Sequence, residues 1–222
     1  MTLVSAHRCL TRDDIEAAIA LGADYVEFDV QRCADGSLVL LHDPADVAPP
    51  GTLGYAEALD LLAGRAKLHL DLKVEGGEVP IVAQAVARLG ADSLLVTTLA
   101  DDGVRAVRDW SDAEGHGLLV GLSLGRGLRD IPVLHAIRVR LTELFPAVRY
   151  RLSGANLAVA HHTLARLHVR SYARHRGFPL LVWTVDTEDS LRYWLKPGRA
   201  WMVTTNRPEV ALRLRSPGRM QP

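Results

Sequence analysis

The sequence has few cysteines and no long apolar run, and both absences narrow the class of protein. Two cysteines, Cys9 and Cys33, are too few for a disulfide framework. We therefore expect a reduced, cytoplasmic protein, with a reversible Cys9–Cys33 bridge as the less favoured alternative. No segment approaches the ~18 consecutive apolar residues that a membrane span needs. The opening MTLVSAHR has no basic region followed by an apolar one, so we expect no signal peptide.

The sequence also lacks an excess of charge of either sign. Lys plus Arg and Asp plus Glu number 26 each among 222 residues, so no global field favours a nucleic acid partner or a membrane surface. Hydrophobic residues make up 48% of the chain, and 222 residues suit one large domain or two small ones with a substantial core. Composition thus leaves an ordinary soluble globular protein as the default interpretation.

Eight short apolar runs alternate with segments of helical period. This alternation predicts a parallel sheet with crossover helices. The count of eight favours a closed (β/α)8 TIM barrel of the α/β class, in which ~200 to 250 residues suffice. No GxGxxG follows the first strand, which argues against an open dinucleotide-binding sheet. We predict one domain over 1–215 and a flexible tail over 216–222. The expected strands are 2–7, 25–30, 67–73, 93–98, 117–123, 154–159, 179–185 and 200–205.

Acidic side chains interrupt two of these strands. Successive strand residues point to opposite faces, so Glu27 and Asp29 share the face opposite the apolar residues of YVEFDV. Asp71 and Lys73 alternate with leucines in KLHLDLK in the same way, and both faces are predicted to point into the barrel. Buried like charges raise one another's pKa, and a hard divalent cation, Mg²⁺ or Ca²⁺, would relieve this. The alternative is a structural ion network of these carboxylates with Lys73 and Arg8.

Two histidines are predicted to flank the acidic cluster. His7 ends the first strand, and His42 follows a short turn after the second. Histidine is the side chain suited to proton transfer near neutral pH. With one divalent ion, the three carboxylates, Arg8 and Lys73 would give a site of about +1 charge, which suits a phosphodiester monoanion.

The ordered motifs resemble the glycerophosphodiester phosphodiesterase family. They are AHRC, GADYVEFDVQRCADGSLVLLHDP, TLGYAEALDLL, KLHLDLK, LVWTVDT and WMVTTNRPEVA, from Ala6 to Pro208. The resemblance implies a phosphoric diester hydrolase of lipid metabolism, often with a neighbouring hydroxyl as nucleophile and a cyclic phosphate as product. The site roles it implies are metal ligation by Glu27, Asp29 and Asp71, acid–base catalysis by His7 and His42, phosphate binding by Arg8 and Lys73, and a pocket wall at Trp183.

The chain departs from the family pattern at four places. Cys9 replaces the usual Gly, so the backbone there either avoids a positive φ or is rebuilt. Asp71 stands where many members carry Glu, which resembles the sphingomyelinase D and lysophospholipase D branch. Asn206 occupies a place often held by Asp. The usual long insertion is nearly absent: segment 44–51 contains two consecutive prolines and is expected to form neither a helix, a strand nor a lid.

We therefore expect a metal-dependent phosphodiesterase that acts on a glycerophosphodiester or a lysophospholipid, with no nucleic acid partner. One alternative is a non-catalytic barrel that binds a phosphorylated ligand; another is an enolate-stabilising metal enzyme, which would more naturally use a Lys base than two histidines. The arginine-rich segment 126–151 is interpreted as a solvated amphipathic barrel helix. Peripheral contact of that segment with an anionic membrane is the open alternative.

Overall fold

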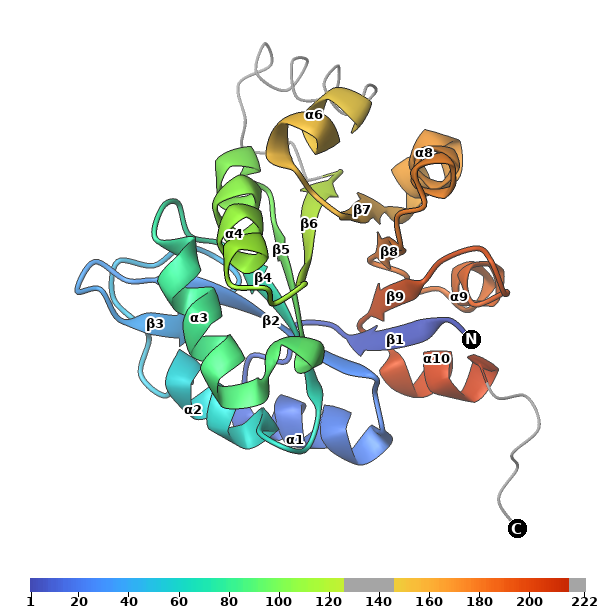
Figure 1. Cartoon of the computed structure of the whole chain (residues 1–222). Helices are drawn as coiled ribbons and strands as arrows, with labels where there is room; N and C mark the ends of the chain where they lie inside the picture. The colour runs from blue at the N-terminus through green and yellow to red at the C-terminus, as the bar shows by residue number, and fades with distance from the viewer. Residues whose placement is uncertain (126–145, 216–222) are drawn as a thin grey trace.

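The fold is a closed barrel of eight parallel strands with helices around it, as the strand count predicts (Figure 1). The computed structural model describes residues 1–125 and 146–215. Pairing of β1 with both β2 and β9 closes the barrel, and β3 adds to β2 in antiparallel register. The strands are β1 (Leu3–Ala6), β2 (Tyr25–Arg32), β3 (Leu38–Leu40), β4 (Lys67–Leu72), β5 (Leu94–Thr98), β6 (Leu119–Leu124), β7 (Leu157–His161), β8 (Leu180–Trp183) and β9 (Met202–Thr205).

The helices form an outer layer around the barrel, and local sequence signals fix the ends of the first one. Thr11 and Asp14 make a reciprocal capping box at the start of α1, and Gly22 ends that helix with φ 73°. The helices are α1 (Arg12–Leu21), α2 (Tyr55–Leu62), α3 (Glu78–Leu89), η1 (Ala91–Ser93), α4 (Asp101–Ala113), α6 (Pro146–Ser153), α7 (His162–Leu164), η2 (Ala165–Val169), α8 (Arg170–Arg176), α9 (Glu188–Trp194) and α10 (Pro208–Arg215).

The barrel interior has an apolar layer and a polar layer. At the amino-terminal ends of the strands the interior is filled by Tyr25, Leu95, Leu157 and Met202, which belong to one buried cluster. Polar residues lie further along the same strands, toward the carboxyl ends where barrel active sites form. The opposite strand faces, such as Phe28 on β2, pack against the helices. The interior therefore closes at one end and leaves a polar pocket at the other.

Two regions need separate description. The helical segment between β7 and β8 is divided into α7, a five-residue π-helix η2 and α8. Of the segment 126–151, only residues from Pro146 onward lie in the described part, where they form α6; the tail 216–222 also lies outside it. No helix within residues 1–125 or 146–215 has both the length and the apolarity required to cross a membrane.

Candidate active site

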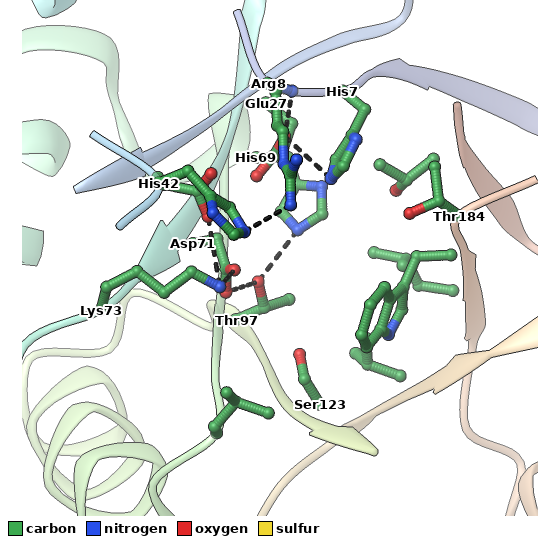
Figure 2. A pocket seen from close by; sticks show the side chains of 16 residues that line it. His7, Arg8, Glu27, His42, His69, Asp71, Lys73, Thr97, Ser123 and Thr184 are labelled. Atoms are coloured by element: carbon green, nitrogen blue, oxygen red, sulfur yellow. Dashed lines mark hydrogen bonds and ion pairs between the residues drawn. The ribbon is translucent and has the colours of Figure 1, made fainter. Parts of the chain in front are cut away.

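All eight residues singled out in the sequence line one pocket at the carboxyl ends of the strands (Figure 2). Its charged wall comes from β1, β2, β4 and the segments that follow them. Its other wall, from β7, β8 and β9, presents apolar side chains and hydroxyls instead. The lining residues are His7, Arg8, Glu27, Asp29, His42, His69, Asp71, Lys73, Thr97, Leu99, Ser123, Val159, Leu181, Trp183, Thr184 and Thr204.

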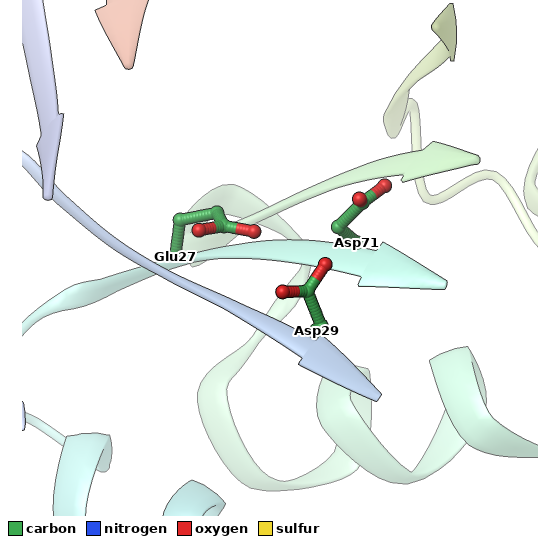
Figure 3. A group of neighbouring side chains, drawn as sticks. All are labelled: Glu27, Asp29 and Asp71. Carbon is green, nitrogen blue, oxygen red and sulfur yellow. The ribbon is translucent and has the colours of Figure 1, made fainter. Parts of the chain in front are cut away.

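Three carboxylates converge on the charged wall (Figure 3). Asp29 and Asp71 are register partners on β2 and β4, and Glu27 lies two residues before Asp29 on the same face. One oxygen from each lies within 4.8 Å of the others. This spacing suits oxygens bound to one hard ion at ~2.0 to 2.6 Å. Asp29 Oδ2 is buried and has no hydrogen-bond partner within the described residues, so the donor set fits a divalent cation.

Lys73 occupies part of this cluster. Its Nζ lies 3.2 Å from Asp29 Oδ1 and also pairs with Asp71 Oδ2. The ion network considered as an alternative is thus realised by Lys73, but not by the Arg8 guanidinium, which contacts His42. One lysine neutralises one of three negative charges. Two remain, and a divalent cation would balance them.

The pKa directions reflect this crowding. Burial raises the pKa of Glu27 well above its ordinary value, and the charges of Asp29 and Asp71 raise it further. Burial also raises the pKa of Asp29 and outweighs the charge of Lys73 there. For Asp71, burial acts in the same direction, but the charge and hydrogen bond of Lys73 and the hydroxyl of Thr97 outweigh it, so the pKa is lowered. The cluster therefore resists carrying three negative charges without a cation.

His7 is held by a chain of two polar residues that sequence reasoning did not connect to it. Asp186 can only accept hydrogen bonds, so the Asn206 amide nitrogen donates to its Oδ2 at 2.7 Å. The Asn206 oxygen then faces His7 and accepts from Nδ1–H at 2.8 Å. This fixes the neutral His7 tautomer with a free lone pair on Nε2, which lies 3.9 Å from Glu27 Oε2. Burial lowers the pKa of His7, in part offset by Asn206.

His42 has the same tautomer for a different reason. Arg8 can only donate, and its guanidinium contacts His42 Nε2, so that nitrogen accepts. Nδ1–H then donates to Asp43 Oδ1 at 2.8 Å, while the Gln31 side chain donates to the His42 carbonyl at 3.1 Å. Both histidines thus carry their proton on Nδ1, with an amide behind His7 and a carboxylate behind His42.

The sequence left open whether the backbone at Cys9, where the family has Gly, adopts a positive φ. In the structure the positive φ lies one residue earlier, at Arg8. Arg8 has φ 55°, and among the described residues it alone combines a positive φ with a side chain. This conformation directs the Arg8 backbone N–H to Glu27 Oε2 at 2.6 Å. Cys9 avoids a positive φ, and its side chain is buried, with Sγ 3.6 Å from the Ala6 carbonyl. Burial raises the pKa of its thiol to about 12. The Gly-to-Cys departure therefore places no strain at position 9.

A second buried chain orients Asp71. Thr97 Oγ1 donates to Asp71 Oδ1 at 2.7 Å and accepts from His69 Nε2–H at 3.0 Å. His69 Nδ1 then accepts from the Ser5 hydroxyl at 3.2 Å. Burial lowers the pKa of His69 to about 3, so this histidine stays neutral and structural. One sequence signal could have indicated Thr97: like Asp71, it lies near the carboxyl end of its strand, with its side chain pointing into the barrel.

The expected pocket wall at Trp183 is present in the pocket. Trp183 contacts the His161 ring edge to face, with centroids 5.8 Å apart. Its indole Nε1 and Thr204 Oγ1 are both buried without a hydrogen-bond partner among the described residues. With Val159 and Leu181 they make a mainly apolar wall opposite the carboxylates, with two polar atoms left for a ligand or water.

Comparison with known proteins agrees with this geometry. The family model for the glycerophosphoryl diester phosphodiesterase family matches residues 11–109. A curated glycerophosphodiester phosphodiesterase from Caldanaerobacter subterraneus subsp. tengcongensis is 23% identical and aligns over 96% of this chain and 97% of its own. A solved glycerophosphoryl diester phosphodiesterase candidate from Agrobacterium tumefaciens has TM-score 0.75 and 16% identity, covering 100% of each chain. An Oleispira antarctica phosphodiesterase, solved with its product sn-glycerol-3-phosphate, has TM-score 0.67 and 17% identity, covering 96% of each.

The solved structures show that the chain has the TIM-barrel fold of these phosphodiesterases. In sequence it resembles the curated glycerophosphodiester phosphodiesterase along 96% of its length, and the family model matches residues 11–109. The family resemblance and the enzyme class predicted from the motifs are therefore confirmed.

Proposed function

We propose that this chain cleaves glycerophosphodiesters in a reaction that requires one divalent cation and uses His7 and His42 as its acid–base pair. The observation that carries the proposal is the buried oxygen Asp29 Oδ2, which has no hydrogen-bond partner among the described residues and lies within a cluster of three carboxylates. A structural ion network would have satisfied that oxygen, because unpaired buried charge is costly.

Glu27, Asp29 and Asp71 would hold the cation, with the remaining positions left for water and substrate oxygens. Carboxylate oxygens are the ligands of hard ions, so Mg²⁺ or Ca²⁺ fits. When bound, such an ion would act as a Lewis acid on a phosphoryl oxygen. The chain's own contribution is to aim three oxygens at one point, which the Thr97 hydroxyl and the Arg8 backbone N–H support.

The two histidines are proposed to act on opposite sides of the phosphorus. His7 presents the Nε2 lone pair of its neutral form, so it would accept the proton of the attacking hydroxyl of the glycerol moiety or of water. His42 would donate a proton from Nε2 to the leaving alcohol oxygen as its bond to phosphorus breaks. Asp43 lies behind Nδ1, beside the positive charge that His42 carries when it holds two protons. One P–O bond forms and one breaks, while His7 gains one proton from the nucleophile and His42 gives one proton to the leaving alcohol.

Arg8 and Lys73 would bind the phosphate. In the structure the Arg8 guanidinium contacts His42 Nε2, the nitrogen proposed to donate to the leaving alcohol. A phosphate oxygen is a stronger partner for guanidinium than a neutral imidazole, so substrate would draw Arg8 away and free His42 to take up its proton. Lys73 lies at the edge of the cluster and can turn from Asp29 toward the same phosphate.

A substrate with a large substituent is the preferred candidate. Segment 44–51 contains no helix or strand, and none of its residues lines the pocket, so it places no lid over the mouth. The wall made by Val159, Leu181 and Trp183 is mainly apolar. A lysophospholipid would place more surface on that wall than glycerophosphocholine does.

The test is turnover of glycerophosphocholine and lysophosphatidylcholine by the purified chain, in chelator and after addition of Mg²⁺ or Ca²⁺. We expect activity only with the cation, and loss of at least ~10³-fold in Asp29→Asn. Glu57→Asn, which removes an exposed carboxylate paired with Arg12, is the matched control and should keep full activity. Phosphorus NMR of the products distinguishes a cyclic phosphate from a monoester. Turnover in chelator, or binding of the substrate without turnover under all conditions, would contradict the proposal.

A further inference from the structure

The basic residues of this protein are distributed unevenly. Residues 146–185 contain six arginines and four histidines, and no Asp or Glu. Because 26 basic and 26 acidic residues balance over the whole chain, the remainder carries six more acidic than basic residues. The basic segment includes α6 and α8 (Figure 1), which line one hollow together, and α7 and η2, which lead directly into α8.

Most of these arginines form no ion pair with a carboxylate, in contrast to several arginines elsewhere on the molecule. On other faces Arg12, Arg65, Arg88 and Arg192 each pair with a carboxylate. Within the described part of the chain, five arginines of the basic segment pair with no carboxylate: Arg151, Arg166, Arg170, Arg174 and Arg176. The exception is Arg149, which pairs with Asp101. Within residues 1–125 and 146–215 no carboxylate pairs with these five arginines, so the described part of this flank carries an excess of positive charge.

Exposed aliphatic side chains accompany these arginines. Val148 and Leu152 on α6 are 58% and 57% exposed, and Leu167 on η2 is 71% exposed. They are three of the six large hydrophobic residues that are exposed among the described residues. Val148 and Leu152 also line a mainly apolar hollow between α6 and α8, together with Arg151 and Arg176. Aliphatic side chains next to guanidinium groups suit the interfacial region of an anionic lipid bilayer.

We propose that this flank, defined as the exposed faces of α6, η2 and α8, is a docking surface for an anionic phospholipid bilayer. Nucleic acid would satisfy the arginines but gives no reason to expose three aliphatic side chains among them. A bilayer satisfies both, since phosphate groups meet the arginines and the acyl boundary accepts Val148, Leu152 and Leu167. The surface extends along the barrel wall. η2 follows α7, whose first residue His162 contacts the carbonyl of Thr184 in the pocket wall, whereas α6 and α8 end just before the amino-terminal ends of β7 and β8.

The test is co-sedimentation of the full chain with vesicles of phosphatidylcholine alone and with one quarter phosphatidylglycerol, in chelator so that turnover and ion bridging play no part. The result is thus independent of the proposed function. We expect binding only to the anionic vesicles. Arg151→Gln, Arg166→Gln and Arg176→Gln combined should weaken it by about 100-fold, at about fivefold per arginine. The control Arg12→Gln, Arg88→Gln and Arg192→Gln loses the same charge elsewhere and should stay within about threefold.

A second pair of variants separates a bilayer from other anionic partners. Leu152→Ser with Leu167→Ser should weaken vesicle binding by about tenfold, since the aliphatic insertion is lost, while Leu21→Ser on α1 should not change it. All are exposed positions, so circular dichroism should remain that of the wild type. Equal losses in the two arginine triples, or no binding to anionic vesicles, would overturn the proposal. So would tighter binding to a DNA duplex that the serine variants leave unchanged.

Discussion

Glu27→Gln tests the central electrostatic inference most directly. Glu27 is 2% exposed, and Asp29 and Asp71 are its nearest charged neighbours in the cluster. Its Oε2 accepts the Arg8 backbone N–H at 2.6 Å, and the amide oxygen of glutamine can accept the same bond. The substitution therefore removes one negative charge and changes little else in shape or hydrogen bonding.

The sign of the stability change follows from the raised pKa of Glu27. Below its ordinary pKa of 4.5 the side chain is protonated in both the folded and the unfolded chain, and its charge costs nothing. As the pH rises, the unfolded chain ionises first, and the metal-free fold loses stability until the folded carboxyl has ionised too. At pH 8 in chelator we expect the variant to be more stable by about 2 kcal/mol, less than the several kcal/mol of an unpaired buried charge. That is about 4 to 8 °C in Tm for a chain of this size.

Cation binding should invert this order. A ligand at about 100 times its Kd adds about 2.7 kcal/mol to the wild type, and the variant should gain far less. Melting curves of the wild type and the variant measure these differences under four conditions: pH 5 and pH 8, each in chelator and with Mg²⁺ or Ca²⁺. The exposed-site variant Glu57→Gln is the control. The reasoning would be refuted by a variant less stable than the wild type in chelator at pH 8, or by a variant that keeps the full cation-induced rise in Tm.

Three further predictions concern the reaction. His7→Ala and His42→Ala should each cost ~10² to 10⁴-fold in rate, and the double variant little more than the worse single, because residues acting as a unit are non-additive; independent, multiplying losses would contradict a shared proton-transfer step. Asn206→Ala should lower kcat by about 10 to 100-fold with little change in KM, since it frees the His7 ring without touching the substrate; a change confined to KM would argue against that role. Lysophosphatidylcholine should have a higher kcat/KM than glycerophosphocholine, and a tenfold preference for the smaller substrate would be the contrary result.

The strand-borne part of the site could be predicted because strand geometry is local. Alternation in YVEFDV and KLHLDLK determines which side chains enter the barrel, and parallel pairing brings Asp29 opposite Asp71. The same two-residue alternation predicted that the acidic side chains point into the barrel near the carboxyl ends of their strands. Closure of the barrel by β1 and β2 then needed no further sequence signal.

The contacts that tune the site could not be predicted, because they depend on side-chain directions between distant segments. His7 and Asn206 are 199 positions apart, and only the closed barrel brings the end of β9 beside the end of β1. The positive φ of Arg8 has no sequence signature, since Arg is not a residue that favours that region. Whether Lys73 contacts a phosphate or the carboxylates likewise depends on the rotamer of its side chain, which the sequence does not determine.

The two walls of the pocket determine how the proposed substrate is oriented. A phosphodiester has one anionic phosphate and two ester substituents, and the strand order separates partners for these parts. Cations and carboxylates come from β1, β2 and β4, whereas Val159, Leu181 and Trp183 come from β7 and β8 across the barrel. The phosphate must therefore face the charged wall while one substituent lies on the apolar one.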